Sequence, residues 1–379
     1  MTLTILAVLS WALLTGSFVY CILTVIAARD YLHVKQPERP EVLPPISILT
    51  PLAGAEEGLA ENLRSSFRQD YPEFEIVYAV RNADDAGGPI ARRVMAEFPH
   101  IPAQIIVTGE PPFANAKVFS LTQMTAAARH ELMVMNDSDI RSAPDMLLTI
   151  AAEFKDPSVG LATCPYRAVP GDGWFARMEA LEMNTHFLGG VLVARMLEGM
   201  KFALGPSAVV RRGALERIGG WQTLGSYLAE DFELGRRIFE NGERVILSSC
   251  RVEHHIGNAG PAANFSHRLR WVRSTRRSRP KGYVGEVFTN PVPAALLLGL
   301  VKLVAWPWVL AALLFRAMSV WAVAGWVLRD PLTRRLSWAL PIQDMATFLV
   351  WVAGFFGNTV HWRGRTYYLH RDGRFELVH

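Results

Sequence analysis

Cysteine is scarce in this chain of 379 residues: Cys21, Cys164 and Cys250 are far apart and odd in number. Such a set argues against a disulfide framework and against the close ligand spacing of a zinc site, and it fits a reducing compartment. We expect Cys164 and Cys250 to be core packing. The sequence also has no internal repeat and no low-complexity tract.

Charge is missing from residues 2–28. At about 1.5 Å per residue, this run crosses a hydrocarbon core of about 30 Å. A cleaved signal peptide is the alternative, but it needs a basic stretch before the apolar run, and the sequence has none. Arg29, Lys35 and Arg39 follow the run. The positive-inside rule therefore places the chain from residue 29 onward in the cytoplasm.

The C-terminal third is also poor in charge. Residues 288–328 carry only Lys302 and Arg316, and residues 337–360 form a second apolar run that contains Asp344. We expect two or three membrane helices within 291–360, and Asp344 should face protein or a polar cavity because a carboxylate in lipid is costly. Six tryptophans are candidate interfacial anchors or bundle packing: Trp306, Trp308, Trp321, Trp326, Trp338 and Trp351.

The basic residues around these runs limit the number of times that the C-terminal segments can cross the membrane. Arg329, Arg334 and Arg335, and the basic tail 361–379, all favour the cytoplasm. We therefore expect one of the C-terminal segments to be re-entrant or to lie flat at the interface.

Between the apolar ends, residues 45–260 alternate short apolar strands with amphipathic helices. This pattern is typical of an α/β domain with a mostly parallel, doubly wound sheet. The expected strands are 46–52, 74–80, 103–108, 131–135 and 159–164, and the expected helices are 57–68, 89–98, 115–129 and 143–154.

Two carboxylates, Asp137 and Asp139, follow the strand expected at 131–135. Ligands of such sheets bind beyond the carboxyl ends of the strands. Paired carboxylates suit Mg²⁺ or Mn²⁺, and the cation reverses the repulsion between acidic side chains and a diphosphate. The alternative is a solvated acidic turn, or a cap in which Ser138 or Asp139 begins the next helix.

Two further blocks carry charge. Glu230 and Asp231 lead into a helical pattern, and the alternative role for Asp231 is to cap that helix. The second block is the segment 261–290, which holds seven Lys/Arg and no acid between 267 and 282. The basic stretch suits anionic lipid heads; nucleic acid is disfavoured because membrane runs adjoin it. In a group-transfer enzyme, Arg270 would neutralise a leaving diphosphate and Trp271 would wall the sugar or acceptor pocket.

In order along the chain, these blocks resemble the inverting family-2-type glycosyltransferases of GT-A fold. The likeness is to ceramide glucosyltransferases and to their bacterial relatives, the hopanoid-biosynthesis glycosyltransferases, over about residues 1–375. It is carried by the following blocks: "ILTPLAGAEEGLAENLRSSFRQDYP", "NAKVFSL" at 115–121, "NDSDI", "ALGPSAVVRRGALERIGGW" at 203–221, "LAEDFELGRRI", and "HRLRW" in the place of (Q/R)-x-x-R-W.

This resemblance implies a UDP-sugar donor, a membrane lipid acceptor and a divalent cation. Asp137 and Asp139 would hold the cation, Asp231 beside Glu230 would be the general base, and Arg270 and Lys117 would stabilise the departing UDP. Pro51 would belong to the nucleotide loop.

The sequence departs from the family pattern at two positions. An Asp usually follows the second strand, whereas this chain has Asn82, with Asp84 and Asp85 close behind; an Asn can still bind a uracil or ribose. The first position of the (Q/R)-x-x-R-W block is His267, which can donate to phosphate when protonated.

Several alternatives remain open. The acceptor is ceramide with UDP-glucose or, alternatively, a hopanoid with UDP-N-acetylglucosamine. A processive polysaccharide synthase needs more membrane helices than these runs supply, and a non-catalytic lipid-binding scaffold does not need three charged blocks in this order. Residues 187–202 suit the bilayer surface or a core helix. His254 or His255 is a candidate for the active site or the metal, although ordinary loop histidines are the default.

Overall fold

The computed structural model describes residues 2–34, 37–301 and 306–378, so Lys35, Lys302 and His379 lie outside the described ranges. The described residues form two compact units. We call residues 37–169, 200–257 and 373–378 the sheet unit, and residues 2–34, 170–199 and 258–372 the helical unit. Residues 170–199 therefore cluster with the apolar helices, although they lie inside the range expected for the α/β domain.

The sheet unit is built on a seven-stranded sheet of order β3-β2-β1-β4-β8-β6-β9. Neighbouring strands run parallel in the half from β3 to β4, whereas β8 is antiparallel to both β4 and β6. The fold class predicted from the sequence, α/β with a mostly parallel sheet, is confirmed. The strands are β1 (Ile46–Pro51), β2 (Phe74–Val80), β3 (Ala103–Val107), β4 (Leu132–Asn136), β6 (Val159–Thr163), β8 (Ser207–Arg211) and β9 (Arg244–Leu247).

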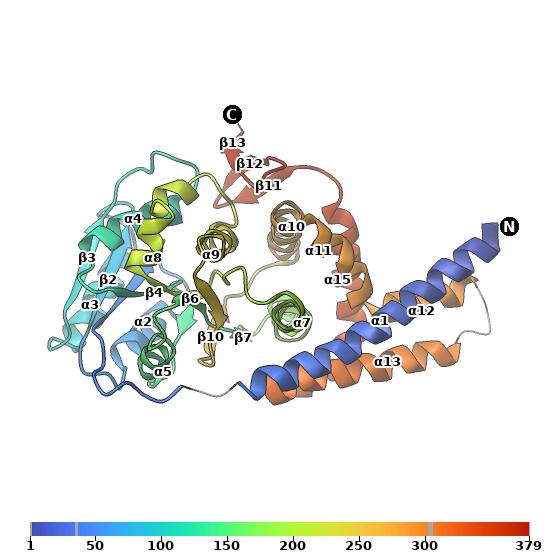
Figure 1. The fold of residues 1–379 in the computed structure, drawn as a ribbon. Coiled ribbons are helices and arrows are strands. Elements are labelled where there is room, and N and C mark those ends of the chain that lie inside the picture. Colours follow the sequence, from blue (N-terminus) through green and yellow to red (C-terminus); the bar gives the residue numbers. More distant parts are fainter. Residues whose placement is uncertain (1, 35–36, 302–305, 379) are drawn as a thin grey trace. The chain divides into compact units, whose positions relative to one another are not determined.

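Helices cover both faces of this sheet, with α4 and α8 above the strands and α2 and α5 below them in Figure 1. Because both faces are covered, central strands such as β2 and β4 are buried along their whole length. A second sheet has the order β5-β10-β7, and its strand β5 is the next strand after β4 along the chain. The remaining elements are α2 (Leu59–Phe67), α3 (Gly87–Glu97), α4 (Ala116–Ala127), α5 (Met146–Glu153), α8 (Arg212–Arg217), η2 (Trp221–Leu224), α9 (Glu230–Glu240), β5 (Ile140–Arg141), β7 (Tyr166–Pro170), β10 (Val252–Ile256) and β13 (Phe375–Leu377).

The helical unit is organised around α1 (Thr2–Leu32), which lies beside α12 and α13 (Figure 1) and also packs against α7. Its apolar contacts bury Leu14 against Ala294, Ala295 and Leu298 of α12. The other elements are α6 (Trp174–Glu182), η1 (Met183–Phe187), α7 (Leu188–Glu198), α10 (Pro261–Ser278), α11 (Pro280–Gly285), η3 (Glu286–Thr289), α12 (Pro291–Val301), α13 (Trp306–Val320), η4 (Trp321–Val327), α14 (Pro331–Arg335), η5 (Ser337–Ala339), α15 (Leu340–Gly354), β11 (Thr359–Trp362) and β12 (Arg365–Leu369).

Two described helices are long and apolar enough to cross a membrane: Thr4–Leu32, and Trp306–Val327, which joins α13 to η4. Helix α12 has 11 residues and α15 has 15. Residues 187–202, expected either at the bilayer surface or in a core, contribute α7, which is largely buried and packs against α1.

Asp344 lies on α15 and is 1% exposed. Both of its carboxylate oxygens accept hydrogen bonds from Arg316 Nε of α13, at 3.0 and 2.9 Å. The prediction that Asp344 faces protein is therefore confirmed.

Two arginines of the basic stretch of α10 are held by hydrogen bonds to another element of their own unit. Arg273 and Arg276 donate hydrogen bonds to the carbonyl oxygens of Phe355, Phe356 and Gly357, just beyond the C-terminal end of α15. Cations at this end of a helix satisfy carbonyls that have no partner within the helix and interact favourably with its dipole. These two arginines therefore have a structural role that lipid heads alone do not explain.

Candidate active site

The parallel strands β1, β2 and β4 bring their carboxyl ends to one edge of the sheet, since β1 pairs in register with both neighbours. Pro51 ends β1, Asn82 lies in the turn after β2, and Asp137 directly follows β4. Asp139 comes two residues later, before the short strand β5. The site predicted from the sequence thus draws its residues from adjacent strand ends.

Lys117 connects two of the predicted acidic motifs. Its ammonium Nζ lies 2.6 Å from Asp137 Oδ1 and 3.4 Å from Glu230 Oε1, and it donates to the carbonyl oxygen of Gly205 at 3.2 Å. The helix that carries it begins after Asn115, whose side-chain oxygen accepts the backbone N–H of Val118 as an N-cap. The cap fixes the first turn of α4 and hence the position of the lysine.

Asn115 has a second role that the sequence reasoning missed. Its Nδ2 donates to the carbonyl oxygen of Tyr227 and to Glu230 Oε2, at 3.0 and 3.1 Å. One buried amide therefore caps α4 and fixes the first residue of α9. The signal was available in the "NAKVFSL" block, where an Asn directly before a helical pattern is a typical cap.

Asp231 lies in the first turn of α9, and its Oδ1 accepts the N–H of Phe232 at 2.8 Å. The N-cap of α9 is Ala229, so Asp231 does not cap the helix. Gly205 lies so close that a Cβ on it would be 2.9 Å from Asp231 Oδ2. The backbone at Gly205 thus forms one wall of the space that this carboxylate occupies.

The cluster shifts the acidities of its members. Burial, with the adjacent charge of Glu230, raises the pKa of Asp231 to about 7, although Lys117 opposes the shift. Burial also raises the pKa of Asp137 to about 6 against the pull of Lys117. For Lys117 itself, burial lowers the pKa, but attraction to Asp137 and Glu230 outweighs it and the pKa is raised.

Asp139 is held by a histidine from β10. His254 Nε2 lies 3.0 Å from Asp139 Oδ2, and the backbone N–H of His255 donates to the carbonyl oxygen of Asp139 at 2.8 Å. Burial raises the pKa of Asp139, but the charge and hydrogen bond of His254 outweigh burial and hold that pKa below its usual value. His255 instead contacts Glu253 Oε2 at 2.9 Å.

A divalent cation fits the carboxylates at this edge. The second oxygen of Asp139, Oδ1, is buried and has no hydrogen-bond partner among the described residues. Hard cations take such oxygens, and Mg²⁺ commonly uses one or two carboxylates together with phosphates of the substrate. No group of three or more His, Cys, Asp or Glu within the described ranges has the arrangement of a metal site. Phosphate oxygens would therefore have to complete the coordination.

Asp85 fixes the loop that follows β1. Its Oδ1 accepts the backbone N–H groups of Gly54 and Gly87, at 3.0 and 2.8 Å. Asp85 therefore joins the loop after β1 to the start of α3, while Asn82 and Asp84 are exposed. On the other side of the same loop, Glu56 Oε2 accepts the hydroxyl of Ser138 at 2.7 Å, so the loop is also tied to the turn that carries Asp137 and Asp139.

The helical unit contains the other predicted site residues, on α10. His267 Nδ1 lies 2.6 Å from Glu179 Oε1, and its ring lies beside Trp271 with centroids 4.9 Å apart. Trp271 also contacts Phe187, at 6.0 Å between centroids. Arg270 is half-buried on the same helix. Glu179, which is 6% exposed, thus orients His267, a role that no local sequence pattern indicates.

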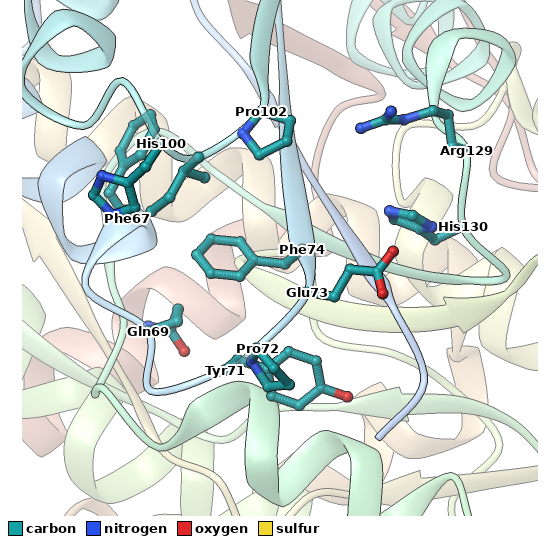
Figure 2. A pocket seen from close by; sticks show the side chains of 11 residues that line it. Phe67, Gln69, Tyr71, Pro72, Glu73, Phe74, His100, Pro102, Arg129 and His130 are labelled. Carbon is teal, nitrogen blue, oxygen red and sulfur yellow. The ribbon is translucent and has the colours of Figure 1, made fainter. Parts of the chain in front are cut away.

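A cavity of about 450 Å³ lies elsewhere in the sheet unit. Figure 2 shows Phe74 and Tyr71 on its walls, with Arg129 and His130 at one side. These residues precede or begin β2 and β4, so the cavity is at the amino edge of the sheet, away from Asp137 and Asp139.

Comparison with known proteins places the chain in a family. The model of glycosyl transferase family 21 matches residues 9–375. The chain belongs to glycosyl transferase family 21. Two similar curated proteins are ceramide glucosyltransferases 1 and 3 of Caenorhabditis elegans, 27% identical over 269 residues and 24% identical over 373 residues. These alignments cover 70% and 94% of this chain, and 57% and 80% of the relatives, so the chain spans just over half the length of the first.

A solved structure shows the same fold. A mannosyltransferase from Pyrobaculum calidifontis, determined with GDP-mannose and Mn²⁺, is 20% identical, with a TM-score of 0.53 over 93% of this family 21 chain and 99% of that one. The predicted resemblance to ceramide glucosyltransferase-like enzymes of GT-A fold is confirmed. The roles of individual residues stay predictions.

Proposed function

We propose that this family 21 glycosyltransferase moves glucose from UDP-glucose to a hydroxyl of ceramide, with inversion at the anomeric carbon. The observation that carries the proposal is the contact of Lys117 with both Asp137 and Glu230, which joins the two acidic motifs in one cluster. The names of the similar relatives supply the sugar and the lipid.

The donor end of the reaction uses the strand ends of the sheet unit. Pro51, Asn82 and the loop fixed by Asp85 would bind the uridine. Asp137 and Asp139 would hold Mg²⁺ or Mn²⁺, which, when bound, neutralises negative charge on the diphosphate. The raised pKa of Lys117 keeps its ammonium charged, so it stabilises the departing UDP.

Asp231 would act as the general base. It accepts the proton of the lipid hydroxyl while that oxygen attacks the anomeric carbon and the bond to UDP breaks. A base works best with a pKa near the operating pH, and burial beside Glu230 raises the pKa of Asp231 to about 7. Attack from the face opposite to UDP inverts the anomeric configuration.

The residues of α10 would serve the same reaction. We assign Arg270 to the leaving diphosphate, Trp271 to the wall of the sugar or acceptor pocket, and His267 to a phosphate contact. Glu179 supports the last assignment by position, because its Oε1 lies 2.6 Å from Nδ1 and holds the ring of His267 in place.

The membrane arrangement is also part of the proposal. Helix α1 would cross the bilayer and leave the chain in the cytoplasm. The short α12 would carry the chain out of the cytoplasm, and the helix Trp306–Val327 would bring it back. Helix α15 would not cross. This arrangement leaves Arg29, Arg329 and the C-terminal tail in the cytoplasm, as the positive-inside rule requires.

The deciding experiment incubates the purified protein with labelled UDP-glucose or UDP-N-acetylglucosamine and with ceramide, a hopanoid or diacylglycerol, and identifies products by mass. We expect glucosylceramide. A product only from UDP-N-acetylglucosamine and a hopanoid would favour the alternative acceptor. A thermal shift with UDP and Mn²⁺ separates an enzyme from a lipid-binding scaffold, because only a protein that binds the nucleotide is stabilised by it.

A further inference from the structure

The turn 204–207, which leads into β8, is a backbone segment that borders two groups of the proposed reaction. The carbonyl oxygen of Gly205 accepts a hydrogen bond from Lys117 Nζ at 3.2 Å. A Cβ on the same glycine would lie 2.9 Å from Asp231 Oδ2, so the backbone also limits the space of that carboxylate. The position of this turn therefore affects the ammonium and the proposed base together.

The turn lies beyond the ends of the two strand pairings that hold β8. The pairing with β6 ends at Thr163 and Ala208, and the pairing with β4 ends at Asn136 and Ser207. Hydrogen bonds between strands thus fix β8 itself. The residues before Ser207 depend on other contacts for their position.

The hydroxyl of Thr163, the last residue of β6, supplies such a contact. Its Oγ1 accepts the backbone N–H of the buried Leu204 at 2.7 Å. The one proton of this hydroxyl is shared between the carbonyl oxygens of Leu204, at 3.3 Å, and Ser207, at 3.4 Å. Thr163 is 0% exposed. A single hydroxyl, shielded from water, therefore ties both ends of the turn to β6.

Packing does not account for this hydroxyl. Strand β6 is buried along its whole length, and valine, which is also β-branched, suits such a strand at least as well as threonine. A valine at position 163 would leave the N–H of Leu204 without its acceptor, and a buried donor without a partner is unfavourable. The hydroxyl of Thr163 therefore serves the turn.

We propose that Thr163 is a positioning residue for the transfer reaction. Its hydroxyl fixes the turn 204–207, and the backbone of Gly205 then places the ammonium of Lys117 and confines the carboxylate of Asp231. The inference deepens the proposed function, on which it rests, by adding a residue that lies outside every charged block of the sequence. Thr163 acts through the turn and not by contact with a substrate.

The first test compares Thr163→Val with the wild-type enzyme in the glucose transfer assay. We expect kcat to fall by up to about 10²-fold, because a displacement of about 1 Å at reacting groups can cost that much. The KM for UDP-glucose should change little, since the uridine is assigned to the loops after β1 and β2. Thr163→Ser keeps the hydroxyl and should restore most of the rate.

Thr125→Val is the matched control. The hydroxyl of Thr125, on α4, accepts the indole N–H of Trp221 at 2.8 Å, so this variant loses a hydrogen bond of nearly the same length within the same unit. We expect a lower melting temperature and an unchanged kcat. A loss of kcat equal to that of Thr163→Val would show that reduced stability, and not the turn, lowers the rate, and it would overturn the inference.

A second measurement does not depend on sugar transfer. Acetylation of Lys117 in the full-length protein, followed by mass spectrometry, should be faster in Thr163→Val, because the ammonium loses the fixed carbonyl oxygen of Gly205. Ser207→Ala removes the hydrogen bond of 2.8 Å from Ser207 Oγ to Asn136 Oδ1 and loosens the same turn. It should give the same result, and it replaces Thr163→Val if that variant does not fold.

The two measurements separate this inference from the proposed function. Unaltered kcat and unaltered acetylation of Lys117 in a folded Thr163→Val protein would overturn the inference and leave the proposed function intact. Faster acetylation in Thr163→Val, together with a wild-type protein that transfers no glucose to ceramide, would support the role of Thr163 in placing the turn and contradict the proposed function instead.

Discussion

Asp231 is half-buried beside the buried Glu230, and its Oδ1 accepts the N–H of Phe232. We expect Asp231→Asn to lower kcat by about 10²–10⁴-fold, because it removes the proton acceptor while keeping the shape of the side chain. Binding of UDP, measured by thermal shift, should be preserved. Turnover at the wild-type rate would remove Asp231 from the mechanism. Asp145→Asn, an exposed carboxylate of the same unit, controls for the loss of a charge.

The raised pKa of Asp231 predicts how the rate depends on pH. A general base must be deprotonated, so kcat/KM should be low in acid and rise through about pH 7, where this carboxyl loses its proton. Lys117 has a raised pKa and stays charged across this range. Initial rates between pH 5 and 9 test the expectation. A profile that is already flat at pH 5 would contradict the assignment.

Gly205 offers a test of how closely the base must be placed. A Cβ at this position would lie 2.9 Å from Asp231 Oδ2, so Gly205→Ala should displace the carboxylate. Displacements near 1 Å can cost about 10²-fold in rate. We expect a loss of that order in kcat with little change in the melting temperature. Gly257→Ala, where a Cβ meets no atom within 4 Å, is the matched control and should be silent.

At this scale, the sequence predicted which residues gather but not how they contact one another. Asp137 and Asp139 could be predicted as candidates because they directly follow a strand whose carboxyl end lies at the edge where such sheets bind ligands. The contacts of Lys117 with Glu230, and of His254 with Asp139, join residues 113 and 115 positions apart, and no local pattern encodes such a contact. Asp85 was expected at the nucleotide, which stays a prediction, and the structure adds that its Oδ1 accepts two loop amides.

At the scale of helices, the pair of Arg316 and Asp344 joins α13 to α15. We expect Asp344→Leu to destabilise the protein by about 3–5 kcal/mol, because the guanidinium is left buried without its counter-charge. The double variant Arg316→Met, Asp344→Leu should recover most of this loss. Thermal unfolding in detergent measures both. If the double variant is as unstable as the single one, the lost stability does not come from an unpaired buried charge, and the expectation is wrong.

The strands and helices of the first half of the sheet unit were predictable because each is a short apolar segment with polar turns at its ends. Strand β2, for example, has the bounds expected from its sequence. Strand β8 was not among the expected strands, because its antiparallel insertion between β4 and β6 depends on pairing, not on local pattern. The π-turn η1 likewise has no sequence period that distinguishes it from α-helix.

At the scale of the whole chain, composition left open which of the C-terminal apolar runs cross the membrane. Apolar runs at 288–328 and 337–360 look equally able to span. The structure distinguishes them, since the first contains the 22-residue helix Trp306–Val327, whereas the second yields the 15-residue α15 with buried Gln343 and Asp344. Length alone does not exclude α15, because α12 is shorter still, so the proposal that α15 does not cross rests on its buried polar residues and on the positive-inside rule.

The arrangement proposed for the membrane predicts the side of each segment. Alkaline phosphatase is active only outside the bacterial cytoplasm, so a fusion after Leu300 should be active, because α12 would have carried the chain to the far side. Fusions after Arg335 and after Leu377 should be inactive, because the helix Trp306–Val327 returns the chain and α15 does not cross. Green fluorescent protein at the same three points should give the inverse pattern. Phosphatase activity after Leu377 together with inactivity after Arg335 would mean that α15 crosses the bilayer after all, and the basic tail would then violate the positive-inside rule.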